Sequence, residues 1–388
     1  MISTTALFII LLSSLLSAFI FSRFHLPWVA ALITAGIVIG PFGLGVVSLD
    51  PTLELFGELG LVFLMFMAGL EIKLSSFKLY KRSIVILSLL TAGTPMILGI
   101  LVATAFGYSM MVSMLIGIIF ISSSVAAIIP SLEHAKLLPT KLGKIIIASA
   151  MVNDIVALIL LSIFLQITNP TTSLPLPLFY GALTLILLGL RWGVPKVREL
   201  RMKFGGREGE FEREIRVVFA MLLGTVVLFE VLGLHAITAG FFTGLIVSDA
   251  ITTDEIKSKL HALAYGIFIP LFFVIVGIKI DIAALLNSQP NTWWLIAALV
   301  SFSILGKFIS GWAGSWLLEF SRPERKYIGF AMVPQLSTTL ATAFVGLQYG
   351  LVDQSIITAM IILGIVSVMV SSFGLSASSQ AIIKMRKQ

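Results

Sequence analysis

The stretch 142–166 reads LGKIIIASAMVNDIVALILLSIFLQ and places one carboxylate, Asp154, in the middle of a mostly apolar run. About 20 apolar residues are enough for a helix to cross the hydrocarbon core of a bilayer. A charged side chain at that depth costs about 2.5 kcal/mol or more, and acids found there generally serve a function. The stretch therefore predicts a transmembrane helix that carries a functional acid near its midpoint.

The composition extends this interpretation to the whole chain. Of the 388 residues, 58% are hydrophobic and 12% are charged, whereas about a quarter of the residues in a soluble domain are charged. In water such a chain would expose a very large apolar surface. These values exclude a soluble enzyme, a disordered chain and a nucleic-acid-binding protein. The chain has no cysteine, and its histidines do not have the spacing of a metal site. It also has no phosphate-binding loop and no dinucleotide-binding motif. We therefore expect no cofactor and no enzymatic activity.

Thirteen apolar runs predict an all-α polytopic membrane protein with about 13 transmembrane helices. The first run lacks a basic start, which favours a retained helix over a cleaved signal peptide. The runs cover 4–22, 28–47, 54–72, 84–106, 112–132, 142–166, 178–193, 214–233, 235–248, 260–281, 293–318, 326–347 and 355–379.

The basic residues predict the orientation of these helices. With the N-terminus outside, 24 of the 26 Lys and Arg residues fall in cytoplasmic segments, as the positive-inside rule requires. We therefore expect a cell-membrane protein with an outside N-terminus and a cytoplasmic C-terminus. Of the two exceptions, Lys279 lies beside Asp281 near a helix end, whereas Lys307 lies about 21 Å along its helix from Trp293. Lys307 therefore needs a counter-charge, for which Asp154 and Asn153 are the candidates, or must be neutral.

The run pattern also suggests two six-helix halves of opposite orientation, joined by the seventh run. Inverted repeats are typical of secondary transporters. The fifth helix of each half carries a break signal, with Ser122 and Pro130 in one and Pro334, Ser337 and Thr338 in the other. Proline removes a backbone donor, and hydroxyl groups can satisfy the freed carbonyls. These signals predict two crossing broken helices whose ends can hold a cation at the midplane; simple kinks are the alternative.

Asp154 can bind a proton or a small hard cation such as Na⁺, but not both at once. Oxygen atoms of Asn153, Ser123 and Ser124 are suitable additional ligands. The structural alternatives are a protonated Asp154 that bonds a neighbouring helix, and a Lys307 that only braces its helix. Glu71 either faces Lys73 or adds a carboxylate at the inner mouth of the path, and Glu230 is expected to form a structural hydrogen bond.

Four motifs, in this order along the chain, carry a resemblance to a known family. They are GIVIGPFGLG at 36–45, AGLE at 68–71, Asn153-Asp154 and Gly306-Lys307. The chain resembles the monovalent cation:proton antiporters, in the branch that includes prokaryotic sodium/proton antiporters and glutathione-gated potassium efflux proteins. The similarity covers essentially the whole chain.

The resemblance implies a scaffold domain that forms a homodimer and a core domain that moves. The scaffold would comprise 1–83 and 214–292 and the core 84–166 and 293–388, with 167–213 as a linker helix and basic loop. The family's ion-binding aspartate corresponds to Asp154 and the residue before it to Asn153. Its core lysine corresponds to Lys307, and the glutamate near the ion in some relatives corresponds to Glu71.

The resemblance has two departures that concern the charge balance. Electrogenic relatives have two adjacent aspartates, whereas this chain has Asn153-Asp154, a pair typical of electroneutral relatives. Those relatives usually have arginine where this chain has Lys307. One carboxylate favours exchange of one cation for one proton. The sequence ends shortly after its last predicted helix, so we also expect it to lack the nucleotide-binding domain of the potassium efflux members.

The expected function is therefore a secondary antiporter that exchanges Na⁺ or Li⁺ for H⁺ at Asp154. A potassium/proton antiporter or potassium efflux channel is one alternative, which a preference for K⁺ or channel-like flux would favour. A sodium-coupled carrier of organic anions is another, which proton-independent uptake would favour. An intramembrane aspartyl protease needs two facing aspartates, and Asp154 has no second midplane aspartate in the sequence.

Overall fold

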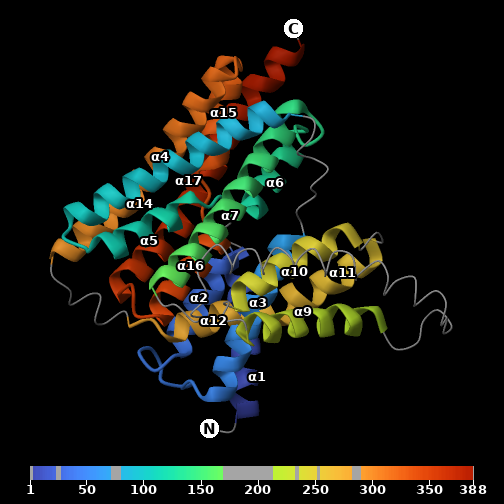
Figure 1. Cartoon of the computed structure of the whole chain (residues 1–388), viewed down its shortest axis with the longest axis vertical. Helices are drawn as coiled ribbons and strands as arrows, with labels where there is room; N and C mark the ends of the chain where they lie inside the picture. Colours follow the sequence, from blue (N-terminus) through green and yellow to red (C-terminus); the bar gives the residue numbers. More distant parts are fainter. Residues whose placement is uncertain are drawn as a thin grey trace. The chain divides into compact units, whose positions relative to one another are not determined.

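A computed structural model describes residues 3–22, 28–70, 80–168, 213–231, 236–250, 254–281 and 290–387, and its elements are helices (Figure 1). This confirms the predicted all-α class. The helices are α1 (Ser3–Ser22), α2 (Trp28–Ile39), α3 (Pro51–Leu70), α4 (Lys81–Ala105), α5 (Met110–Ile121), α6 (Val125–His134), α7 (Lys141–Thr168), α9 (Arg213–Val231), α10 (Ala236–Ala250), α11 (Asp254–Leu263), the π-helix η2 (Ala264–Phe268), α12 (Ile269–Ile278), α14 (Pro290–Leu317), α15 (Arg322–Met332), α16 (Ser337–Gln348) and α17 (Gln354–Lys387).

Among the described residues, 6 helical stretches are long and apolar enough to span a membrane. They are 51–70, 81–105, 141–168, 255–278, 290–317 and 354–379. The predicted run 178–193 and the split near residue 234 lie outside the described residues, so the count of thirteen stays a prediction.

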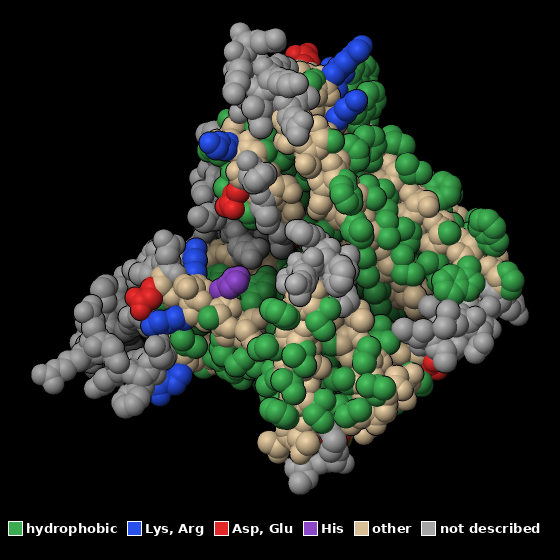
Figure 2. All heavy atoms as spheres, turned by 180° about the vertical axis from the view of Figure 1, so that it is seen from behind, with side chains coloured by type: hydrophobic (Ala, Val, Ile, Leu, Met, Phe, Trp, Pro, Cys, Tyr) green, Lys and Arg blue, Asp and Glu red, His purple; other side chains and the backbone are tan. Residues whose placement is uncertain are grey.

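The exterior of these helices carries large apolar side chains. Leu89 on α4 is 71% exposed, and Trp294 and Leu305 on α14 are 71% and 53% exposed. Green hydrophobic side chains cover much of the described surface in Figure 2. Such an apolar surface is unfavourable in water. It is compatible with contact to lipid, because helices also satisfy their own backbone hydrogen bonds there.

Several predicted helix ends need correction. The run 28–47 forms a helix only to Ile39, because Pro41 has no N–H and disfavours a helical residue before it. The chain turns there, with Gly45 at φ 66°. The last helix extends beyond the predicted residue 379 to Lys387, because polar residues after the apolar span do not interrupt it.

The chain clusters into two compact units. The first holds the described parts of 1–11, 49–73 and 162–275. Within it α3 and α10 cross at glycines: a Cβ added to Gly244 would lie 2.0 Å from the Phe66 carbonyl oxygen, and one added to Gly69 would lie 2.1 Å from that of Phe241. Small residues therefore permit the close crossing.

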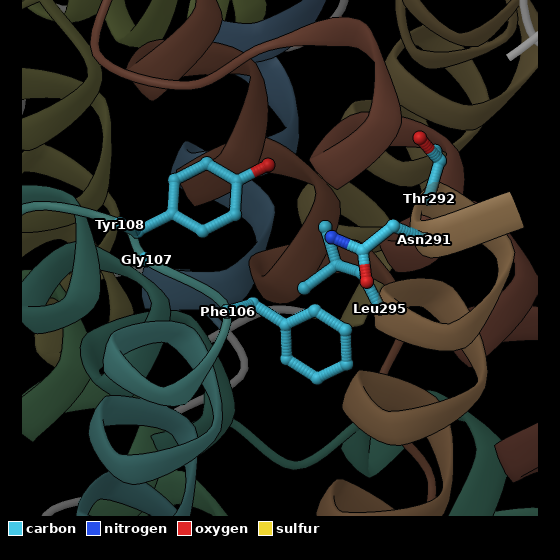
Figure 3. Close-up of a pocket in the computed structure, with 6 residues that line it drawn as sticks. All are labelled: Phe106, Gly107, Tyr108, Asn291, Thr292 and Leu295. Atoms are coloured by element: carbon cyan, nitrogen blue, oxygen red, sulfur yellow. The ribbon is translucent and has the colours of Figure 1, made fainter. Parts of the chain in front are cut away.

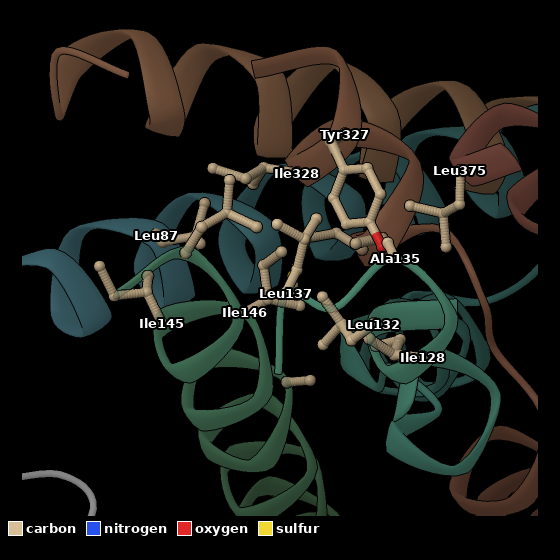
Figure 4. Packing of buried hydrophobic residues seen from close by; sticks show 14 of the residues in the cluster. Leu87, Ile128, Leu132, Ala135, Leu137, Ile145, Ile146, Tyr327, Ile328 and Leu375 are labelled. Carbon is tan, nitrogen blue, oxygen red and sulfur yellow. The ribbon is translucent and has the colours of Figure 1, made fainter. Parts of the chain in front are cut away.

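The second unit holds the described parts of 12–48, 74–161 and 276–388. In it α4 runs beside α14 (Figure 1), with Gly306 against Leu98 and Gly314 against Leu87. The unit contains a buried hydrophobic cluster that includes Leu87, Ile146 and Tyr327 (Figure 4). The division into scaffold and core domains expected from the resemblance stays a prediction.

The two predicted helix breaks lie in this second unit and are confirmed. The first separates α5 from α6 at Ser122–Ser124, and Ser122 has an extended backbone with ψ 156°. The second separates α15 from α16 at residues 333–336, which include Pro334. Two details of the prediction were wrong. Pro130 lies inside α6 rather than at the break, because the serines already interrupt the helix, and Ser337 and Thr338 belong to the first turn of α16.

Candidate functional site

Lys307, on α14, donates hydrogen bonds to oxygen atoms at the first break. Its side chain is fully buried, and its Nζ donates to the Thr91 carbonyl at 3.0 Å, the Ile121 carbonyl at 2.5 Å and Ser123 Oγ at 2.9 Å. Ile121 is the last residue of α5, and a helix C-terminus carries partial negative charge and unpaired carbonyls. The ammonium therefore satisfies the helix end that the break exposes.

Asp154 meets the same break from α7. Its Oδ1 accepts a hydrogen bond from the Ser123 backbone N–H at 3.2 Å, and the carboxylate interacts electrostatically with Lys307. The aspartate is only partly buried. Ser123 thus stands between the two charges, with its N–H on the carboxylate and its hydroxyl on the ammonium. Lys307 and Asp154 were predicted to pair. The hydrogen bonds given above for Lys307 Nζ go to neutral oxygens, and its interaction with Asp154 is electrostatic.

Asn153 is fixed by α4. Its Nδ2 donates to Thr91 Oγ1 at 2.9 Å, and that hydroxyl donates to the Leu87 carbonyl at 2.7 Å. Within the described residues, the buried side-chain atoms without a hydrogen-bond partner are Asn153 Oδ1, Ser149 Oγ and Ser113 Oγ. A buried oxygen without a partner is unfavourable, so Asn153 Oδ1 is available to a cation or a water molecule.

The two breaks contact each other directly. Ser122 Oγ and Thr339 Oγ1 lie 2.6 Å apart, and the Ser124 N–H donates to the Pro334 carbonyl at 2.7 Å. Ser123 Oγ also donates to the Met332 carbonyl at 3.4 Å. These bonds join the broken helices at their interruptions, as the crossing arrangement predicts.

The structure thus brings together Asp154, Asn153, Ser123 and Lys307 at the first break. Ser122 and Ser124 link it to the second break. Glu71 lies outside the described residues, and of Ser337 only the helical backbone is described. Within the described residues there is no cluster of three His, Cys, Asp or Glu residues.

Sequence reasoning missed Thr91, which contributes both its carbonyl and its hydroxyl. It also gave no role of its own to Gln335, which is completely buried at the second break. Both residues are polar within apolar runs, and this pattern could have marked them as candidates. Their hydrogen-bond partners could not be predicted, because those partners lie far away in the sequence.

A pocket of about 160 Å³ lies at a different place in the second unit, where α4 ends and α14 begins (Figure 3). Its lining includes Phe106, Tyr108 and Asn291. Asn291 is sixteen residues from Lys307, or about 24 Å along a helix, so the pocket is separate from the break. Tyr108 donates to Asp353 Oδ2 at 2.9 Å, and burial together with that carboxylate raises the tyrosine pKa above its usual value.

Comparison with known proteins gives a consistent result. The family model described as "Sodium/hydrogen exchanger, transmembrane" matches residues 8–379. The chain is 31% identical over 354 residues to a probable Na⁺/H⁺ antiporter 3 of Methanocaldococcus jannaschii, covering 89% of this chain and 88% of that one. It is 30% identical over 371 residues to a Na⁺/H⁺ antiporter of Enterococcus hirae, covering 94% of each.

A solved structure shares the fold. The sodium proton antiporter MjNhaP1 of Methanocaldococcus jannaschii, at pH 8, superposes with a TM-score of 0.69 at 20% identity and covers 99% of each chain. At this identity the likeness concerns the fold alone.

Proposed function

The chain belongs to the sodium/hydrogen exchanger family of monovalent cation:proton antiporters, and from that premise we propose that it exchanges Na⁺ or Li⁺ for H⁺ across a membrane. The observation that carries the proposal is the partly buried Asp154 at a helix break, held by the Ser123 N–H at 3.2 Å. A carboxylate in this position can take up either a proton or a small cation from water. It cannot hold both, so the two ions compete.

The surrounding residues give each ion a reason to bind. For a cation, the Asp154 carboxylate provides the charge, and Asn153 Oδ1 and the serine oxygens of the break provide neutral ligands. Proton binding depends on opposing effects on the unprotonated carboxylate. Partial burial disfavours the unprotonated carboxylate and so promotes proton uptake, whereas the Ser123 N–H and the Lys307 charge stabilise the unprotonated carboxylate. We propose that only the neutralised site, protonated or cation-bound, crosses between the two sides of the membrane.

The charge count favours exchange of one cation for one proton. Asn153 stands beside Asp154 and contributes no charge, and Lys307 is anchored by oxygens of α4 and of the first break. One carboxylate that changes between two neutralised states moves no net charge per cycle. The outside N-terminus, the cytoplasmic C-terminus and a homodimer complete the proposal.

The test is proton movement in proteoliposomes with Na⁺, Li⁺ and K⁺ added in turn, with and without a membrane voltage. We expect Na⁺ and Li⁺ to drive proton movement that voltage does not change. Asp154→Asn should reduce it to the level of empty vesicles. Glu255→Gln is the matched control, because it also removes one carboxylate but only from an exposed helical ion pair with Lys259 at 2.9 Å.

Full cation-dependent proton movement in a folded Asp154→Asn protein would sink the assignment of the site. A clear preference for K⁺ would instead favour a potassium exchanger, and proton-independent uptake of an organic anion would favour a sodium-coupled carrier. Voltage-dependent exchange would contradict the one-to-one stoichiometry alone.

A further inference from the structure

Gln335 is held at four atoms in the second break. Its side-chain Nε2 and Oε1 lie 2.9 and 3.2 Å from Ser303 Oγ on α14. Its backbone N–H donates to Ser367 Oγ on α17 at 3.1 Å, and that hydroxyl lies 3.3 Å from its carbonyl oxygen. All three side chains are completely buried. A residue outside a regular helix is thus fixed by side chains of two different helices.

The anchor on α14 shares a face with Lys307. Ser303 precedes Lys307 by four residues, and residues at this spacing lie one above the other on a helix. One turn of α14 therefore contacts both breaks, with Lys307 at Ile121 and Ser123 and with Ser303 at Gln335. The relative position of the two breaks is set by the same rigid element.

A short series of bonds leads from Gln335 to the carboxylate. Pro334 is its neighbour, and the Pro334 carbonyl accepts from the Ser124 N–H at 2.7 Å. Ser124 follows Ser123, whose N–H holds Asp154 Oδ1 and whose hydroxyl accepts from Lys307. A shift of the second break would therefore move the backbone that holds the carboxylate.

We propose that Gln335, through Ser303 and Ser367, is a positioning residue that fixes the geometry of the cation- and proton-binding site at Asp154. This inference rests on the proposed exchange function. Gln335 lies in contact with hydroxyl groups rather than with Asp154, so it acts through the Pro334–Ser124 bond. The network is neutral, so it positions the site without adding charge to the transport cycle.

The experiment uses Gln335→Met, which keeps the length of the side chain but removes its polar atoms, together with Ser303→Ala and the double variant. Ser310→Ala is the matched control: Ser310 is also buried on α14, but its hydroxyl donates to the Lys307 carbonyl of its own helix at 3.1 Å. Each protein is measured for Na⁺-driven proton movement over a range of Na⁺ concentrations and pH. Hydrogen exchange of the backbone amides at 122–124, 333 and 335–337 is followed by mass spectrometry; Pro334 has no amide hydrogen.

We expect Gln335→Met to lower the apparent Na⁺ affinity about tenfold and to displace the pH profile, as the loss of buried neutral hydrogen bonds predicts. Amide exchange at both breaks should be faster, because the opening free energy falls. The double variant should be no worse than Gln335→Met, because both single changes remove the same pair of bonds. Ser310→Ala should match the unaltered protein in all of these measurements.

Two results would overturn the inference. Unchanged amide exchange at the breaks in Gln335→Met shows that the residue is no anchor, whatever happens to transport. Faster exchange with unaltered Na⁺ affinity and pH profile shows an anchor that does not position the ion site. Failure of the unaltered protein to exchange Na⁺ for H⁺ would contradict the proposed function instead, and the amide exchange would still decide whether Gln335 fixes the break.

Discussion

The two helix breaks of the second unit pose the same physical problem and meet it with different chemistry. Each interruption leaves backbone groups without helical partners inside an apolar environment. At the first break the buried ammonium of Lys307 binds the Ile121 carbonyl, and the Asp154 carboxylate accepts from Ser123. At the second, Gln335 and two serine hydroxyls make a neutral network.

The difference separates two tasks. A buried charge is unfavourable unless it is well paired, and it responds strongly to another charge that arrives nearby. A neutral network in which every polar group is hydrogen-bonded responds little to an arriving charge, and its main effect is to make the local structure rigid. We therefore interpret the charged break as the part that senses the ion and the neutral break as the frame against which it is held.

The largest effect is expected when the charge of the first break is removed. Lys307→Gln leaves one polar group where Nζ made three hydrogen bonds, so the Thr91 and Ile121 carbonyls lose their partner. We expect a loss of stability of about 3 kcal/mol, since bonds to charged groups contribute about 1.5–3 kcal/mol each. Thermal unfolding in detergent measures it, with Ser310→Ala as the control.

Lys307→Arg sharpens the same prediction, because it keeps the charge and offers more donors in a rigid planar group. It should retain more stability and more exchange than Lys307→Gln. Equal stability of Lys307→Gln and the unaltered protein would contradict the view that charge closes the first break.

Much of this arrangement could be predicted from the sequence, because the relevant signals are local. An acid or a lysine within an apolar run marks a functional position, and Asp154 and Lys307 stand out for that reason. A proline or a group of hydroxyl side chains within such a run indicates a helix break, and these signals indicated the position of both interruptions. Pro130 misled the prediction, since a proline inside a helix and a proline at its end give the same signal.

The partners of the breaks could not be predicted in this way. Asn153 binds Thr91, which is 62 residues away, and Lys307 binds the Thr91 carbonyl 216 residues away. Such pairs depend on which helix faces which, and helix-length apolar runs say little about that. Gln335 looks like part of a break motif in the sequence, whereas its anchors on α14 and α17 appear only once the helices are packed.

A smaller effect is expected at the direct link between the breaks. Ser122 Oγ and Thr339 Oγ1 lie 2.6 Å apart and both residues are buried. Ser122→Ala or Thr339→Val alone leaves a buried hydroxyl without this partner, which should lower stability by about 1–2 kcal/mol. The double variant should be less destabilised than the sum of the two, and thermal unfolding of all three proteins gives the coupling.

Strict additivity in that cycle would mean that the two hydroxyls do not stabilise each other. In that case the charged and the neutral break would be joined mainly through the backbone bond from Ser124 to Pro334. Exchange activity helps to distinguish the cases, because loss of a real link should also weaken apparent Na⁺ affinity.

The smallest effect is expected far from the breaks, where the same two broken helices are tied at their other ends. Tyr108 precedes α5, Asp353 follows α16, and the tyrosine hydroxyl donates to the carboxylate at 2.9 Å. Tyr108→Phe should lower stability near neutral pH by less than about 1 kcal/mol, because the bond is exposed to water. Asp353 keeps its bond to the Ile356 N–H and so still begins α17.

The pH dependence of this difference follows from the raised pKa of Tyr108, which burial and the Asp353 charge cause. The folded state holds the phenolic proton more tightly than the unfolded state, so the contribution is complete below about pH 10, the unfolded tyrosine value, and declines as pH rises beyond it. Thermal unfolding between neutral and strongly alkaline pH should therefore show the gap between the unaltered protein and Tyr108→Phe becoming narrower. A gap that stays constant or widens across that range would mean that the hydroxyl does not bind the carboxylate, and that this bond does not tie the start of α5 to the end of α16.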